Sequence, residues 1–211
     1  MVFSPVSCKK HPGPRILLAV QGHSDFPTQV RQLTDQLGQE GIDVLGALFD
    51  LTAQRLVRLA VAMTRNQYDA EDAVQAVMER VARKPASLRD AESPWPYLLR
   101  MVRNEALLIV RKKKRWSLSH CINDLVTLRR VDELEQEDTH RQVWTALRSL
   151  PTPQAEVVVL KIWEGMTFAQ ISQLLEVSPN TAASRYQYGM QKLAGRLART
   201  AEEAFEQEAP R

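Results

Sequence analysis

The stretch that decides the fold is TFAQISQLLEVSPNTAASR, residues 167–185. Its apolar residues Phe168, Ile171 and Leu175 recur three and four positions apart, which predicts the buried face of a short helix. Ser178-Pro179 then predicts the N-cap and the first residue of a second helix. Two short helices joined by a short turn form a helix-turn-helix.

The second of these helices carries polar side chains at its start. Such a helix can enter the DNA major groove, where these side chains reach base edges and phosphates. An ordinary helical hairpin shows the same apolar periodicity, and the order of polar residues up to Ser184-Arg185 favours DNA binding over it. Arg185 suits guanine or phosphate, and Gln187 suits adenine. The predicted DNA-contacting residues are Ser178, Asn180, Thr181, Ser184, Arg185 and Gln187.

Another helical pattern precedes this motif in the chain. An apolar stripe from Val44 to Met63, which includes Phe49, predicts a long amphipathic helix. After a break at residues 64–68, we expect Asp69 to cap a second helix, because a carboxylate accepts hydrogen bonds from the first free backbone N–H groups.

The end of that second helix leads to a third. Lys84-Pro85 ends the second helix, since proline cannot continue it. A polar loop is expected over residues 86–93. Ser93-Pro94 opens the third helix, which ends in the basic run 111–116. In the C-terminal part, helices are expected at 142–149, 153–163, 167–175 and 179–197.

The chain is expected to be all-α, with two small helical domains joined by a flexible linker. Its low aromatic content of 6% favours helices over sheets. The pattern weakens after residue 116, and residues 117–142 carry 6 acidic against 3 basic residues, a net charge of −3. The predicted divisions are a poorly ordered N-terminal extension at 1–42 with a short helix at 28–39, a domain at 43–116, an acidic linker at 117–141, a helix-turn-helix domain at 142–200 and a frayed tail at 201–211.

Several function classes are disfavoured by the sequence. Cys8 and Cys121 form no disulfide framework, which favours a reduced cytoplasmic setting. The histidines lack metal-ligand spacing, and the sequence has no glycine-rich phosphate loop, so we expect no metal, no cofactor and no enzymatic activity. No apolar run is long enough for a membrane span, and residues 16–20 are too short for the core of a signal peptide.

The C-terminal pattern resembles a known family. The matching pieces, in order, are Leu150-Pro151, residues 157–160, Glu164-Gly165-Met166-Thr167 and the helix-turn-helix ending in Ser184-Arg185. This order looks like the domain of extracytoplasmic-function (ECF) sigma factors that reads the promoter −35 element. The chain departs from the family at Ala183, where lysine is common, and at Gln170-Ile171-Ser172, where Glu-Ile-Ala is common. The resemblance therefore implies −35 recognition without assigning the bases.

The helix start DAEDAVQ, residues 69–75, resembles the family segment that docks on the clamp helices of the polymerase's largest subunit. Taken alone, it also fits a solvated helix start, where acidic residues favour the helix dipole. Its occurrence with the helix-turn-helix, in the family's order and spacing, favours docking. The resemblance places core-polymerase contacts at Glu71, Asp72 and Gln75.

Aromatic and basic residues gather around the third helix of the first domain. Cations track phosphates and aromatic rings stack on unpaired bases, so this mixture suits separated DNA strands. In ECF sigma factors the matching helix recognises and opens the −10 element, although Leu108 stands where the family often has aspartate. Trp95 also suits a core anchor, and the basic run also suits a solvated helix end. The resemblance places −10 contacts at Trp95, Arg100, Arg103, Asn104, Arg111, Lys112, Lys113, Lys114 and Arg115.

The resemblance implies a sigma factor that is monomeric when free, with bacterial core RNA polymerase, promoter DNA and an anti-sigma protein as partners. Two other functions stay open. A stand-alone helix-turn-helix regulator would bind two-fold DNA sites as a dimer. A sigma-mimicking adaptor would need the polymerase-docking residues but not the basic run at 111–115.

Overall fold

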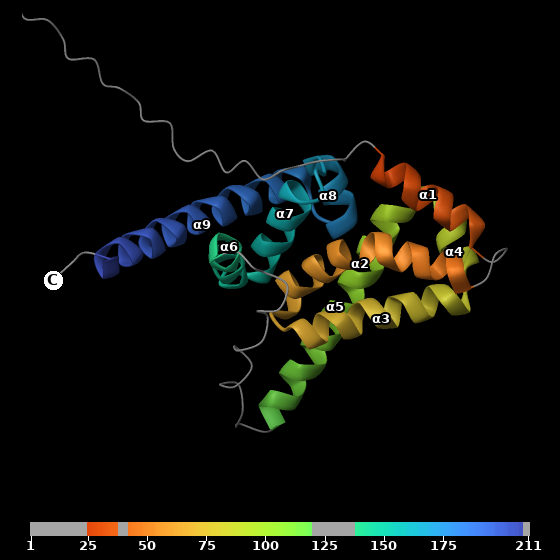
Figure 1. Ribbon diagram of the computed structural model, residues 1–211, viewed down its shortest axis with the longest axis horizontal. Helices are drawn as coiled ribbons and strands as arrows, with labels where there is room; N and C mark the ends of the chain where they lie inside the picture. Colours follow the sequence, from red (N-terminus) through yellow and green to blue (C-terminus); the bar gives the residue numbers. More distant parts are fainter. Residues whose placement is uncertain (1–24, 38–41, 120–137, 209–211) are drawn as a thin grey trace, which may run out of the picture.

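The computed structural model describes residues 25–37, 42–119 and 138–208, and every regular element in these ranges is a helix (Figure 1). The predicted all-α class is confirmed. The helices are α1 (Phe26–Gln36), α2 (Ile42–Thr64), α3 (Gln67–Arg83), α4 (Ala86–Arg89), α5 (Pro94–Ser119), α6 (Asp138–Arg148), α7 (Thr152–Ile162), α8 (Phe168–Leu175) and α9 (Pro179–Glu208). Of the acidic linker predicted at 117–141, residues 117–119 belong to α5 and residues 138–141 to α6. Its middle part, both cysteines and residues 1–24 lie outside the described residues.

The N-terminal half is a bundle of α2, α3 and α5, which pack against one another. Leu56 and Leu59 of α2, Val77 of α3 and Leu98 of α5 have no exposed surface, as their spacing predicts for inward faces. Phe49 was expected in the same stripe but is 43% exposed. It lies at the edge of the stripe, where α3 does not cover it fully.

The turn between α2 and α3 differs from its prediction. Arg65 adopts a left-handed backbone with φ 58°, and this ends α2 at Thr64. The N-cap of α3 is Asn66, whose side chain accepts a hydrogen bond from the backbone N–H of Asp69 at 3.0 Å. Asp69 was predicted as the cap, and this prediction is wrong. Its buried carboxylate pairs with Lys113 of α5 at 2.7 Å instead.

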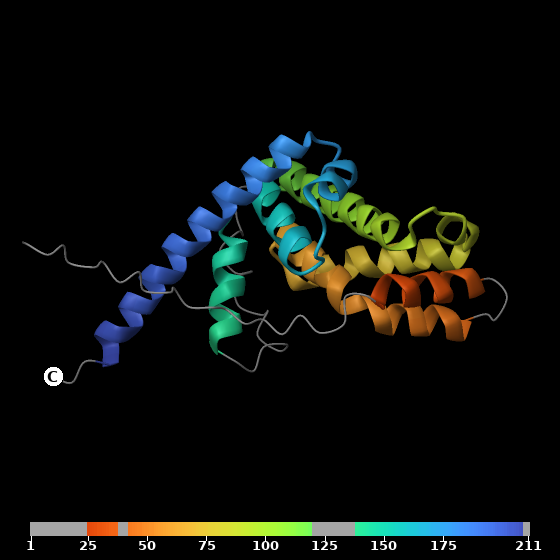
Figure 2. The ribbon, with the colours of Figure 1, turned by 90° about the horizontal axis from the view of Figure 1, so that it is seen from above.

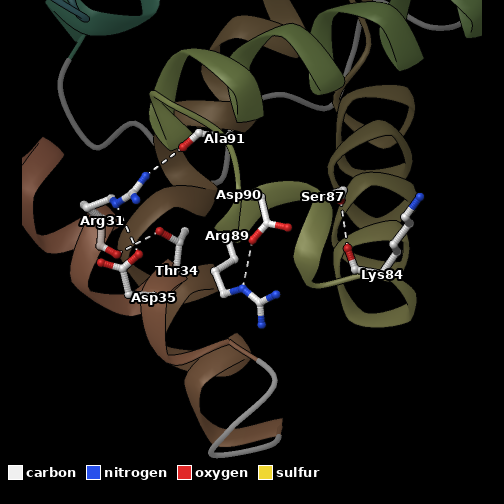
Figure 3. A network of polar contacts seen from close by, with 8 residues as sticks. All are labelled: Arg31, Thr34, Asp35, Lys84, Ser87, Arg89, Asp90 and Ala91. Carbon is white, nitrogen blue, oxygen red and sulfur yellow. Dashed lines mark hydrogen bonds and ion pairs between the residues drawn. The ribbon is translucent and has the colours of Figure 1, made fainter.

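Part of the predicted extension is ordered. α1 overlaps the predicted helix at 28–39 but begins and ends earlier, and it buries Phe26 and Val30 against α2 and α5. Arg31 donates a hydrogen bond to the carbonyl of Ala91 at 2.7 Å, which fastens α1 to the segment before α5 (Figure 3). α1 thus supports the short helix α4, which takes the place of the first half of the polar loop expected at residues 86–93.

The C-terminal half is built on α7, which packs against both α8 and α9. Thr167 and Gln170 form a capping box at the start of α8. Glu176 ends α8 with a left-handed backbone, φ 57°, and this residue makes the turn of the predicted helix-turn-helix. Figure 2 shows α9 running away from the N-terminal bundle. α9 continues to Glu208, through most of the tail that was expected to fray from residue 201.

Two glycines of α9 allow a matched test of this packing. A Cβ on Gly189 would lie 2.9 Å from Cγ2 of Val158 in α7, whereas a Cβ on Gly195 meets nothing within 4 Å. We expect Gly189→Ala to destabilise the fold by about 1–3 kcal/mol through overpacking. Gly195→Ala should stabilise it by up to about 1 kcal/mol through helix propensity. Urea unfolding measures both, and equal effects of the two changes would contradict the close α7–α9 contact.

Candidate nucleic-acid and polymerase interface

The start of α9 presents polar side chains on one face. Asn180, Ser184 and Gln187 are exposed, and their spacing of four and three residues aligns them on the helix. The hydroxyl of Ser178 accepts a hydrogen bond from the backbone N–H of Thr181 at 3.0 Å, which confirms its prediction as the N-cap. Ser178 therefore holds the recognition helix in place, and the neighbouring exposed residues can reach a ligand.

Arg185 occupies a different environment from its exposed neighbours. Its side chain is half-buried, and its positive charge acts on the carboxylate of Glu156 in α7. Phe168 of α8 packs edge-on against Tyr186, with ring centroids 5.7 Å apart. The ring contact joins α8 to α9, and Arg185 lies close enough to α7 to stabilise the packing of α9 as well.

The predicted polymerase-docking residues lie on α3. Glu71, Asp72 and Gln75 are exposed, and Glu71 accepts a hydrogen bond from Gln67 at 2.6 Å. Glu71 and Gln75 border an open groove of about 510 Å³ between α2 and α3. Its apolar lining residues are Leu45, Phe49, Val57, Val74, Met78 and Ala82. A largely apolar groove with acidic and amide groups at its rim suits a helical protein partner.

Phe49 is a groove residue that the sequence interpretation missed. It was assigned to the core because it continues the stripe of α2, yet its exposed ring lines the groove. The signal that could have found it is its offset of one position from Leu48, which is fully buried. Neighbouring positions on a helix point about 100° apart, so the two cannot both face the core centre.

The residues predicted for −10 contact fall into two environments. Arg111, Lys112, Lys113, Lys114 and Arg115 are all exposed on the last turns of α5. Lys113 pairs with Asp69. Trp116 beyond them is 75% exposed, so rings and cations adjoin at this end of α5.

Trp95 does not share this exposure. It is 6% exposed, and its ring meets Phe26 of α1 edge-on at 4.8 Å. The guanidinium of Arg55 lies 5.3 Å from its ring centroid. The structure therefore buries Trp95 as a core anchor, and in this arrangement its ring cannot stack on a base. This burial against Phe26 argues against its prediction as a DNA contact.

Arg100 and Arg103 of α5 are engaged by the C-terminal half. Arg100 donates a hydrogen bond to the backbone carbonyl of Gln173 in α8 at 2.8 Å. Nε of Arg103 lies 3.3 Å from Oε1 of Glu156 in α7. Asn104, next along the helix, is exposed. The contiguous −10 cluster expected from sequence is thus divided: part is open to solvent and part is occupied.

A second cleft adjoins Asn104. It measures about 340 Å³ and is lined by Arg80, Lys84, Ser87, Tyr97, Arg100, Met101 and Asn104. Arg80 and Lys84, at the end of α3, were absent from the predicted contacts. They bring positive charge beside the exposed ring of Tyr97, the combination that suits an unpaired nucleotide.

Buried carboxylates meet arginines where the two halves of the protein touch. Glu164, with no exposed side-chain surface, pairs with Arg55 of α2 at 2.9 Å. Burial raises the pKa of the Glu164 carboxyl, against the opposing charges of Arg55 and Arg58. Burial likewise raises the pKa of Glu156, against Arg103 and Arg185.

These shifts predict how stability depends on pH. A raised carboxyl pKa means that the folded protein binds a proton more readily than the unfolded chain, so stability falls as pH rises from 4.5, the ordinary value, through the raised pKa. Glu164→Gln and Glu156→Gln each remove one titrating group. We expect each to flatten this decline, and the double variant to flatten it most, in urea unfolding measured at a series of pH values. Parallel curves for wild type and variants would contradict the assignment.

The described residues contain no group of three or more histidine, cysteine or acidic side chains that could hold a metal. No helix within them is long and apolar enough to cross a membrane. Three surfaces on the described residues are suited to binding: the groove of α2 and α3, the basic end of α5 and the polar face of α9.

Comparison with known proteins finds a family match in each half of the chain. The family described as sigma-70 region 2 matches residues 48–116, and the family described as sigma-70, region 4, matches residues 140–193. The ECF RNA polymerase sigma factor SigE of Mycolicibacterium smegmatis is 30% identical over 185 residues, covering 85% of this chain and 72% of SigE. The ECF RNA polymerase sigma factor SigK of Mycobacterium sp. strain KMS is 26% identical over 181 residues, 79% of this chain and 89% of SigK.

A solved structure has the same fold. CnrH, in complex with the cytosolic domain of CnrY, superposes with a TM-score of 0.55 at 20% identity, over 80% of this chain and 96% of CnrH. The family matches cover the helices that carry the groove, the basic face and the helix-turn-helix. The chain belongs to the extracytoplasmic-function group of the sigma-70 family of RNA polymerase sigma factors.

Proposed function

We propose that this sigma factor docks on core RNA polymerase through the groove between α2 and α3 and reads the promoter with α5 and α9. The observation that carries the docking assignment is the apolar groove itself, with Glu71 and Gln75 at its rim. An apolar helix face can bury against Val74 and Met78 while polar groups at the rim fix its register.

The −10 element is assigned to the basic end of α5 and to the cleft beside Asn104. The exposed run of residues 111–115 supplies charge for phosphates. Tyr97 and Trp116 supply exposed rings that can stack on unpaired bases. Arg100 and Arg103 complete this surface once they are released from the C-terminal half.

The −35 element is assigned to the first turns of α9. Asn180, Ser184 and Gln187 form the exposed face that can meet base edges in the major groove. Thr181 and Arg185 flank this face. The capping box of α8 and the left-handed Glu176 hold the two helices of the motif rigidly, which is what a recognition helix needs.

We propose the domain division 43–116 and 142–200, joined by the acidic linker 117–141, of which residues 120–137 lie outside the described residues. The family matches at 48–116 and 140–193 support it. α1 packs on the first domain and belongs with it. Two modest DNA contacts joined by a tether gain affinity through effective concentration, so neither domain needs to bind strongly alone. The linker's negative charge suits a basic channel of the polymerase.

This assignment also suggests the cellular location of the protein and a further partner. A subunit that joins RNA polymerase works in the cytoplasm, and it contributes recognition with no catalysis of its own. We also propose an anti-sigma protein as a partner, supported by the solved complex of CnrH with the cytosolic domain of CnrY. We propose that the free protein is a monomer, and gel filtration separates this from the dimer expected of a stand-alone regulator.

The docking assignment is tested with a triple variant, Glu71→Ala/Asp72→Ala/Gln75→Ala. It should lose co-elution with bacterial core RNA polymerase, because it removes Glu71 and Gln75 from the rim of the groove and the neighbouring exposed Asp72. The matched control is Asp90→Ala/Glu92→Ala/Gln32→Ala, which also removes two acids and one glutamine, all exposed and outside the groove. Equal retention of both variants would contradict the docking site. No co-elution of a folded, monomeric wild type would sink the polymerase assignment as a whole.

The −35 assignment is tested by Ser184→Ala/Gln187→Ala. Both side chains are exposed, so their loss should spare the fold and reduce run-off transcription from a cognate promoter. Two lost base contacts correspond to roughly 1–3 kcal/mol each. Gln191→Ala, farther along α9 and also exposed, is the control. Transcription that falls equally for Gln191→Ala, or stays at the wild-type level for the double variant, would overturn the assignment.

A further inference from the structure

The segment between α3 and α5 forms one wall of the cleft beside Asn104. Lys84 and Ser87 of this wall segment, residues 84–93, line the cleft together with Tyr97 of α5. The hydroxyl of Ser87 donates a hydrogen bond to the carbonyl of Lys84 at 2.8 Å, so the two lining residues are held to each other (Figure 3). The shape and the charge of the cleft therefore depend on where the wall segment lies.

The wall segment has little stability of its own. Its helix, α4, is four residues long, and such a short helix does not persist without tertiary contacts. Pro85 at its N-cap supplies no side-chain hydrogen bond. The ion pair of Arg89 with Asp90, at 3.0 Å, joins adjacent residues, so it does not anchor the segment to its surroundings. Leu88 has no exposed surface, and α4 packs against α1, α3 and α5. The position of the segment is therefore set by these neighbouring helices.

α1 holds the end of the wall segment that leads into α5. Nη1 of Arg31 donates a hydrogen bond to the carbonyl of Ala91 at 2.7 Å, across 60 positions of the chain (Figure 3). Nε of the same guanidinium lies 3.1 Å from Oδ1 of Asp35, one turn along α1, which orients it. Phe26 meets the ring of Trp95, in the first turn of α5, at 4.8 Å. α1 thus contacts the chain at two points where the wall segment becomes α5.

We propose that α1 is a positioning element for promoter reading: its brace, formed by Phe26 and Arg31, fixes the wall segment and thereby sets how strictly the cleft discriminates among unpaired bases. Neither brace residue lines the cleft, so each acts through the wall segment. This assignment rests on the proposed function, because the cleft is assigned there to the −10 element. α1 precedes residues 48–116, which match sigma-70 region 2, so the family match gives it no part in promoter reading.

Discrimination among bases depends on placement more than affinity does. Arg80 and Lys84 bring positive charge to the cleft, and attraction between charges falls off slowly with distance, so it tolerates a small displacement. Ser87 and Asn104 bring a hydroxyl and an amide, which can bond base edges. Such a bond needs a donor–acceptor distance of about 3 Å and a nearly straight angle. A released wall segment should therefore keep most of the affinity for unpaired DNA and lose part of the preference among bases.

The first test measures the wall segment in the free protein by hydrogen–deuterium exchange. Arg31→Met removes the guanidinium and keeps an unbranched side chain at an exposed position, so the fold should survive. The backbone N–H groups of Leu88 and Asp90 are bonded within the segment, to Pro85 and Ala86. We expect them to exchange roughly three- to tenfold faster, because the loss of an anchoring hydrogen bond favours local opening.

The matched control is Arg83→Met at the end of α3. It also removes one exposed guanidinium and breaks an ion pair with an acid one helical turn away, here Glu79 at 4.0 Å. Arg83 neither lines the cleft nor belongs to the wall segment. Exchange at Leu88 and Asp90 should therefore stay at the wild-type rate.

The second test measures the preference among bases. The holoenzyme that each variant forms with bacterial core RNA polymerase is incubated with single-stranded DNA of randomised sequence, and the bound strands are sequenced. At the position of strongest preference, the ratio between the best and the second-best base should fall roughly three- to tenfold in Arg31→Met, a part of the discrimination that well-placed hydrogen bonds provide. Overall affinity should change much less, because the cations of the cleft remain. A merely structural role would lower the affinity for all sequences alike and leave the ratio unchanged.

A second variant tests the other contact of the brace. Phe26→Leu removes the edge-on ring contact with Trp95 and keeps an apolar side chain against α5. It should speed exchange in the wall segment and lower the base ratio, as Arg31→Met does. Wild-type exchange in both brace variants overturns the positioning by α1. Faster exchange with an unchanged base ratio, or a ratio that Arg83→Met lowers equally, overturns the role in discrimination.

Failure of the proposed function gives a different result. A wild-type holoenzyme that shows no preference among the randomised strands would refute the assignment of the cleft to the −10 element. The exchange measurement needs neither polymerase nor DNA, so it still decides whether α1 holds the wall segment.

Discussion

The arrangement of the whole protein depends on the burial of Glu164. A carboxylate with no exposed surface must have a cation beside it, and Arg55 of α2 supplies one. That guanidinium also lies over Phe26 and near Trp95, so α1 and α5 join the same cluster. The cluster around this ion pair thus joins α1, α2, α5 and the segment that follows α7.

The two surfaces follow different physical rules. The face of α9 is positioned by a capping box, a left-handed turn and an aromatic contact. Rigid placement of polar groups suits base edges in an intact groove. The face of α5 combines exposed cations and rings, which tolerate varied nucleotide positions and suit separated strands. The groove of α2 and α3 has a largely apolar lining, which suits a protein partner rather than DNA.

The helices that could be predicted from the sequence are those with a clear apolar periodicity. The stripes of α2, α3 and α5 and the signals Lys84-Pro85, Ser93-Pro94 and Ser178-Pro179 predicted elements that the structure contains. Local chemistry sometimes allowed two answers, as at the start of α3, where Asn66 and Asp69 both suit an N-cap. The segment of α1 was expected to be mostly poorly ordered. A helix this short is stabilised by its packing against α2 and α5, which its own sequence does not reveal.

The sequence by itself determined the helices, the helix-turn-helix and the kinds of residue that each surface carries, because periodicity, capping and turn chemistry are local. Only the tertiary structure decided which of those residues are free. Trp95 became a core anchor because Phe26, far from it in sequence, covers its ring. Arg100 and Arg103 became occupied because α7 and α8 bring acceptors to them. Burial and ion pairing between distant segments depend on how the helices pack, and no local pattern records that packing.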